Sequence, residues 1–301
     1  ERYGCKAYTD YKEMLKDPDV ELVSIATPSV EHVDQAVAGI KADKHVFLEK
    51  PIAINHTEAK KLKRAQDKCK KKIFCRHNRR FEPAFQHVYE ILKSKVIGDP
   101  YDIRLSRQSY SRRNDWQTLL SEAGGQLLNW GPHVLDHALI FLDSPIESLW
   151  SHMTKKTAAG DAEDTIRIIM KGEKDRTVEV HISAAAAITC DQYVIFGTKG
   201  ALTCDGQNIR VRYLDPDNKL PRRTVIRGTP PMEGGFNYPD DLQWVEKEFP
   251  VAPELDVTTD SIWEYLYYSI RNRRKFPISL DHAIDIMRVV DMVKKGTPYE
   301  I

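Results

Sequence analysis

The stretch Val46-Phe47-Leu48-Glu49-Lys50-Pro51 joins three apolar residues to a carboxylate, an ammonium group and a proline ring. Proline cannot donate to a β ladder, so the stretch predicts a buried strand that ends at Glu49 and Lys50. In open α/β sheets, ligands bind at the carboxyl ends of the strands. Burial lowers the pKa of a lysine, so Lys50 is a candidate for proton chemistry. On these residues alone, a strand end with two solvated charges is an equally good interpretation.

The segments on both sides of this stretch alternate between strand-like and helix-like patterns. Helices are predicted over residues 9–17, 30–42 and 56–71, and strands over 20–26, 45–48 and 73–75. This alternation is typical of parallel βαβ units in a doubly wound sheet.

After about residue 79 the pattern becomes α+β. Helices are predicted near 82–94 and 131–142 and strands over 101–109 and at several places between 146 and 213; a long excursion follows over 214–256, and two helices close the chain over 258–273 and 281–295. We expect a large, mostly antiparallel sheet with helices on one face. The predicted domains are 1–78, part of a Rossmann sheet, and 79–301.

Composition narrows the class of protein. The chain has 301 residues, 41% of them apolar, and a net charge of +1, which gives no indication of a nucleic-acid or membrane partner. No apolar run approaches the roughly 20 residues of a membrane span. The five cysteines are scattered and odd in number, which favours free thiols and a cytoplasmic location. An export signal ahead of residue 1 is compatible with the same pattern.

A second dense segment runs from Gly124 to His137. Pro132 suits the first turn of a helix, which would place His133 near the positive end of the helix dipole and favour its neutral form. A neutral histidine can accept a proton, and Asn129 could bind a hydroxyl or carbonyl group beside it. Taken alone, a histidine on a helix is more often structural.

The same segment invites a test for metal binding. His133, Asp136 and His137 form H-x-x-D-H, one methylene short of the H-x-x-E-H zinc pattern. Asp is shorter than the required Glu, and the sequence offers no further ligand cluster, so we predict no metal.

Together, these segments resemble the Gfo/Idh/MocA oxidoreductases, the glucose–fructose oxidoreductase and inositol dehydrogenase group. The resemblance lies in the order and spacing of several motifs: Thr27-Pro28 with His32, His45 to Pro51, Asn78-Arg79-Arg80-Phe81 with Pro83, Ile97-Gly98, Gly124 to Asp136, and Phe196 to Gly200. It covers about residues 1–213 and the closing helices.

The resemblance implies hydride transfer between NAD or NADP and a carbinol carbon of a sugar or polyol. It implies that Lys50 and His133 assist proton transfer. The implied cofactor-binding residues are Thr27, Pro28, His32, Glu49, Lys50 and Arg79. The implied substrate-binding residues are Asn129, Trp116, Arg113, Arg112 and His137. For the loop that carries Arg112, Arg113 and Trp116, an ordinary exposed basic loop is an equally good interpretation.

The sequence departs from the family pattern at two places. Asn129 stands where many members have Asp, and Gln126 replaces the third glycine and narrows the nearby space. The G-x-G-x-x-G fingerprint of a dinucleotide-binding domain is also missing. We therefore expect that these residues belong to a longer chain, and that they contain only the last three strands of the Rossmann sheet.

Two other functions remain open at this point. One is a glycoside hydrolase of the same family that retains NAD, and the other is a non-catalytic sugar-binding relative. A sheet with one uncovered face also predicts a homodimer or homotetramer formed through that face.

Overall fold

The computed structural model describes residues 4–222, 224, 241–252 and 258–300. Its first layer is a three-stranded parallel sheet in the order β1-β2-β3. The strands are β1 (Leu22–Ile25), β2 (His45–Leu48) and β3 (Ile73–Cys75), and the helices between and before them are α1 (Tyr11–Lys16), α2 (His32–Lys41) and α3 (His56–Gln66). The predicted parallel βαβ units are therefore confirmed.

Local capping explains where the helices of this layer begin. The side chain of Asp10 accepts a hydrogen bond from the Lys12 N–H at the start of α1, and Asn55 does the same for Glu58 at the start of α3. The predicted end of α3 at residue 71 was wrong, because the helix ends at Gln66. There the Gln66 side chain turns to accept a hydrogen bond from the Ile73 N–H at 2.7 Å, which leads the chain into β3.

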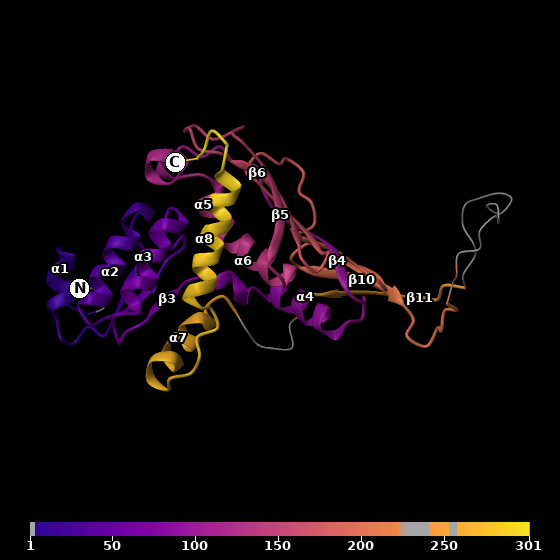
Figure 1. The fold of residues 1–301 in the computed structure, drawn as a ribbon, viewed down its shortest axis with the longest axis horizontal. Helices are drawn as coiled ribbons and strands as arrows, with labels where there is room; N and C mark the ends of the chain where they lie inside the picture. Colours follow the sequence, from indigo (N-terminus) through magenta and orange to yellow (C-terminus); the bar gives the residue numbers. More distant parts are fainter. Residues whose placement is uncertain (1–3, 223, 225–240, 253–257, 301) are drawn as a thin grey trace.

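Successive side chains of β2 point to opposite faces of the small sheet. Val46 packs on α2, where a Cβ on Gly39 would lie only 3.0 Å from a Val46 methyl group. On the opposite face, the ring of Phe47 lies 4.8 Å from that of Trp263 in α7 (Ser261–Arg271). The final helix, α8 (Leu280–Lys294), contacts α3 and β3 as well as α6 and β5. The two closing helices, assigned by sequence to the second domain, thus also pack against the first layer (Figure 1).

The second sheet has eight strands in the order β11-β10-β9-β8-β4-β7-β6-β5. All neighbours are antiparallel except β4 and β7, which are parallel. The strands are β4 (Pro100–Gln108), β5 (Ile146–Thr154), β6 (Thr165–Gly172), β7 (Thr177–Ser183), β8 (Tyr193–Gly197), β9 (Gly200–Cys204), β10 (Asn208–Leu214) and β11 (Trp244–Pro250). The predicted mostly antiparallel sheet is confirmed.

Strand β11 corrects the prediction of a long excursion over 214–256. It pairs with β10, and Arg210–Glu248 and Arg212–Glu246 ion pairs cross the two strands. The charged residues obscure the hydrophobicity pattern of the strand, in which Val245 and Phe249 are partly buried and pack against the core. The rest of that prediction, over 225–240 and 253–257, lies outside the described residues.

Helices cover one face of the large sheet (Figure 1). They are α4 (Pro83–Ser94), α5 (Gln126–Asn129), α6 (Gly131–Leu142) and α8. Four short 3₁₀ helices are also described: η1 (Ser29–Glu31) lies between β1 and α2 in the first layer, and η2 (Asn78–Phe81), η3 (Trp116–Thr118) and η4 (Leu120–Glu122) lie between β3 and α5 in the chain. In β6, Ile166, Ile168 and Met170 are fully buried, whereas the alternating Arg167 and Ile169 are exposed. The sheet is therefore open-faced, as predicted. None of the described helices is long and apolar enough to cross a membrane.

Candidate active site

The carboxyl ends of the three parallel strands form one edge of the first layer. Thr27 and Pro28 follow β1 and are exposed, and Glu49 and Lys50 follow β2. Arg76 follows β3 and forms an ion pair with the Glu49 carboxylate. The sequence reasoning missed Arg76, although its place directly after a strand could have indicated it.

His32 is a buried residue that connects the loops after β1 and β2. It is 1% exposed, and its ring nitrogens lie 2.7 Å from the carbonyl oxygen of Pro51 and 3.0 Å from that of Thr27. His32 can therefore act on a cofactor by holding the two loops that follow β1 and β2.

Lys50 extends from this edge to α5, a helix that covers the second sheet. Its Nζ donates hydrogen bonds to the main-chain oxygen of Asn129 at 2.9 Å and to Asn129 Oδ1 at 3.1 Å. Burial lowers the pKa of Lys50; the Glu49 charge opposes this shift, and Arg79 and Arg113 add to it. The structure thus brings together Lys50 and Asn129, two residues that lie 79 positions apart.

Asn129 is positioned by α5, and α5 is held by a residue that the sequence reasoning missed. Glu163 is buried, and its Oε1 accepts a hydrogen bond from the Leu127 N–H at 2.8 Å. Gly125 has φ of 103°, and a Cβ there would lie 2.3 Å from a Glu163 carboxylate oxygen, so only glycine fits. Burial raises the pKa of Glu163 to about 7. No sequence pattern singled out this carboxyl group.

His133 lies on the first turn of α6 and is 7% exposed. Its ring centroid is 5.9 Å from that of Trp130 and 6.3 Å from that of His77, and its buried Nδ1 has no hydrogen-bond partner among the described residues. Burial lowers the pKa of His133 well below its usual value, and the charge of Lys50 adds to the shift. The expected neutral form therefore has burial as its main cause, and the helix dipole is not needed to explain it.

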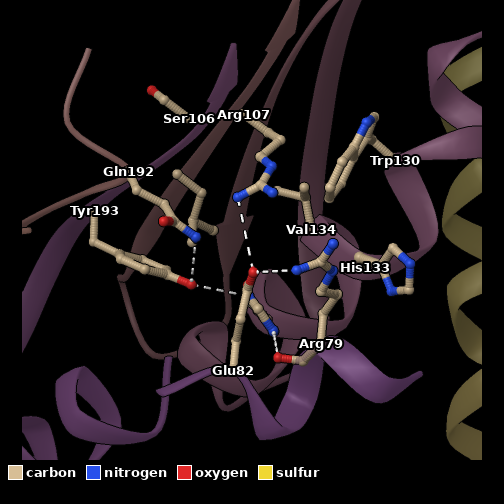
Figure 2. A pocket seen from close by; sticks show the side chains of 11 residues that line it. Arg79, Glu82, Ser106, Arg107, Trp130, His133, Val134, Gln192 and Tyr193 are labelled. Atoms are coloured by element: carbon tan, nitrogen blue, oxygen red, sulfur yellow. Dashed lines mark hydrogen bonds and ion pairs between the residues drawn. The ribbon is translucent and has the colours of Figure 1, made fainter. Parts of the chain in front are cut away.

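A polar cluster lies beside His133 (Figure 2). Glu82 accepts a hydrogen bond from Arg79 at 2.6 Å, and Arg107 lies 3.9 Å from the same carboxylate. The guanidinium groups of Arg79 and Arg107 lie 5.2 and 4.1 Å from the Trp130 ring centroid. The cavity between these side chains has a volume of about 20 Å³, enough for about one water molecule.

Asp136 and His137 are held by partners other than His133. The His137 ring stacks on Phe85 with centroids 3.9 Å apart, and its nitrogens lie 3.0 Å from the Arg79 carbonyl oxygen and 3.2 Å from the Tyr193 hydroxyl. Asp136 is 1% exposed and pairs with Arg80 and His282. Burial alone would raise the pKa of Asp136, but these partners hold it well below its usual range. His137 therefore forms part of the wall of the cavity beside His133. Its contact with substrate stays a prediction.

The loop before α5 carries three predicted substrate-binding residues, Arg112, Arg113 and Trp116. Of these, Arg113 lines the cavity beside Asn129. Arg113 donates hydrogen bonds to Asp115 and Gln117 and lines a cavity of about 10 Å³ with Asn129 and Glu163. Arg112 and Trp116 are exposed and line neither this cavity nor the one beside His133. Their role in substrate binding stays a prediction.

Two protein-family models match this chain. The model of the Gfo/Idh/MocA oxidoreductase family with an NAD-binding Rossmann fold matches residues 1–77, and that of the Gfo/Idh/MocA C-terminal domain matches residues 85–203. The chain belongs to the Gfo/Idh/MocA family of NAD(P)-dependent oxidoreductases.

Named relatives are distant in sequence. Myo-inositol 2-dehydrogenase of Thermotoga maritima is 28% identical over 68% of this chain and 62% of its own length. The NADP(+)-dependent scyllo-inositol 2-dehydrogenase of Bacillus subtilis is 22% identical over 96% of this chain and 80% of its own length. Among solved structures, an NAD-binding protein from Listeria innocua matches 98% of this chain and 85% of its own, with a TM-score of 0.83 and 19% identity.

The sequence-predicted cofactor-binding residues at the sheet edge are accessible to a ligand. Thr27 and Pro28 are exposed, and Glu49 and Lys50 are partly exposed beside them. His133 Nδ1, which has no hydrogen-bond partner in the part of the chain that the structure describes, is a further polar atom on α6. Thr27, Pro28, Glu49 and Lys50 would therefore hold the cofactor; Arg79 lines the cavity beside His133, and its contact with the cofactor stays a prediction.

Proposed function

We propose that the chain takes part in NAD(P)-dependent oxidation or reduction of a CH–OH group of a sugar or polyol. The observation that carries this proposal is the contact of Lys50 with Asn129, next to a buried His133, at the carboxyl edge of a parallel sheet. When bound, the nicotinamide supplies a hydride acceptor or donor for the reacting carbon. The protein must then move one proton at the reacting oxygen.

Two groups are suited to that proton step. His133 is held neutral by burial, so it can accept a proton from a substrate hydroxyl. Lys50 has a lowered pKa and donates a hydrogen bond to Asn129, which holds its ammonium group in one position. An amide cannot take up a proton, so Asn129 orients Lys50 and leaves the proton step to Lys50 and His133.

The function is tested by mixing the protein with NAD⁺ or NADP⁺ and a panel of sugars and inositols while following the NADH absorbance band. We expect an increase in absorbance with at least one member of the panel. Consumption of a glycoside without accumulation of NADH would instead favour the NAD-retaining glycoside hydrolase. Sugar binding without nicotinamide binding, measured by calorimetry, would favour the non-catalytic relative.

We also propose that the uncovered face of the large sheet forms a homodimer or homotetramer. Trp150 on β5 and Ile169 on β6 are directly paired on this face and are 55% and 37% exposed. Sedimentation velocity is expected to show a species larger than a monomer, and Trp150→Glu is expected to shift it toward the monomer because a charge is placed in the contact. A monomeric native protein would contradict this proposal.

A further inference from the structure

A third cavity lies next to the candidate active site and is much larger than the two described above. Its volume is about 300 Å³, at the lower end of the roughly 300–1,000 Å³ typical of small-molecule sites. It shares Arg107 and Trp130 with the cavity beside His133 (Figure 2), and Gln126 with the cavity beside Asn129. A ligand that reaches the His133 region could therefore extend into this third cavity.

The lining of this cavity is polar and almost balanced in charge. One cation, Arg107, and one anion, Asp205, face it. Hydroxyl and amide side chains predominate among the other lining residues: Ser106, Gln108, Ser109, Gln126, Ser183, Thr189 and Gln192. Such a surface suits an uncharged ligand that is rich in hydroxyl groups, because each hydroxyl can donate and accept a hydrogen bond.

The cavity is also preformed. The Gln108 amide oxygen accepts a hydrogen bond from the Cys190 N–H at 2.8 Å, and its nitrogen lies 2.7 Å from His181 Nδ1. The segment around Cys190 is thus tied to the end of β4. On the other side, the Gln192 amide donates to the Tyr193 hydroxyl at 3.2 Å. A ligand would not need to order these walls on binding.

Gln126 lies between this cavity and the one beside Asn129, and it supplies a buried acceptor. The side chain is 8% exposed, and its buried Oε1 has no hydrogen-bond partner among the described residues. The main chain at this position is held in place, because the Gln126 N–H donates to the Glu163 carbonyl oxygen at 3.1 Å and the Leu127 N–H donates to the Glu163 carboxylate at 2.8 Å. A buried acceptor without a partner is unfavourable, so a ligand that donates a hydrogen bond to it gains binding energy.

We propose that the third cavity binds a second, uncharged polyhydroxyl unit linked to the reacting sugar or polyol, and that Gln126 accepts a hydrogen bond from one of its hydroxyl groups. The preferred substrate is then a glycoside, and Gln126 is a specificity-determining residue. This inference rests on the proposed oxidoreductase function for the position of the reacting unit.

The kinetic test compares parent compounds with their glycosides in NAD(P)⁺ reduction: D-glucose with cellobiose and maltose, and myo-inositol with galactinol. We expect kcat/KM for at least one glycoside to exceed that of its parent by tenfold or more. In Gln126→Leu, which has a similar size but no acceptor, this ratio is expected to fall close to one. Gln243→Leu, at an exposed position just before β11 and outside the lining of these cavities, is expected to keep the native ratio.

A binding test without turnover separates this inference from the proposed function. Saturation-transfer difference NMR of the same sugars with the cofactor-free protein is expected to show stronger saturation of the second unit of the glycoside, and Gln126→Leu is expected to lose it. Circular dichroism checks that this variant folds. Equal kcat/KM for parents and glycosides, or an NMR pattern unchanged by Gln126→Leu, would overturn the inference. Absence of NAD(P)⁺ reduction with every sugar, accompanied by the expected NMR pattern, would overturn the oxidoreductase function and leave the binding site supported.

Discussion

Lys50→Met is expected to lower kcat for NAD(P)⁺ reduction by about 10²–10⁴-fold, the usual contribution of a positioned proton-transfer group. Methionine keeps the length and most of the volume of the side chain but has no ammonium group. It therefore removes both hydrogen bonds to Asn129 and the charge that acts on His133. Initial rates under saturating cofactor and substrate measure the effect. Lys68→Met, an exposed position at the end of α3, is the matched control and is expected to keep the native rate.

The pH profile distinguishes a proton-transfer role for Lys50 from a purely structural one. Because burial lowers the pKa of Lys50, the limb of the profile that belongs to this residue is expected below its ordinary value of 10.5. Asn129→Asp places a carboxylate next to Nζ, which favours the ammonium form and is expected to move this limb to higher pH. A rate in Lys50→Met within a factor of three of the native rate, or a limb unmoved by Asn129→Asp, would show that Lys50 does not act in the proton step.

Arg80→Met is expected to reduce the free energy of unfolding by about 3–5 kcal/mol, because it leaves a buried carboxylate without its main partner. Arg80 donates to Asp136 through two nitrogens, one of them at 3.0 Å, and also to the Pro277 carbonyl oxygen at 3.0 Å. His282 is the other partner of Asp136, at 2.7 Å. These contacts join η2, α6 and α8, and so connect the end of β3 to the helix that carries His133. The loss would be a large part of the roughly 5–15 kcal/mol that stabilises a typical protein.

Urea unfolding followed by circular dichroism measures this effect. The double variant Arg80→Met/Asp136→Leu is the informative control, since replacement of a buried ion pair by apolar groups is often neutral or stabilising. We expect the double variant to regain much of the lost free energy. A loss of less than 1 kcal/mol in Arg80→Met would show that the pair contributes little to stability.

Much of the secondary structure could be predicted from short stretches of sequence. The strands over 45–48 and 73–75 and the helix over 131–142 were predicted with their observed bounds, because a proline, a turn or a buried apolar run marks each end. Strand β11 was missed because three charged residues in a row, Glu246 to Glu248, separate its two partly buried apolar residues, Val245 and Phe249. The packing of α7 and α8 against the first layer could not be predicted from neighbouring residues. It depends on contacts such as that of Phe47 with Trp263, which join residues far apart in the chain.

Some features of the candidate site could also be predicted from the sequence, and others depend on the tertiary structure. The sequence by itself determined the family, the alternation of strands and helices, and the placement of Lys50 at a strand end, since all of these depend on neighbouring residues. Only the tertiary structure decided that Lys50 contacts Asn129, that burial holds His133 neutral, and that Glu163 pins the segment between Gly125 and Asn129. Burial and long-range hydrogen bonds are properties of the packed chain, because they depend on which distant residues exclude water from a group.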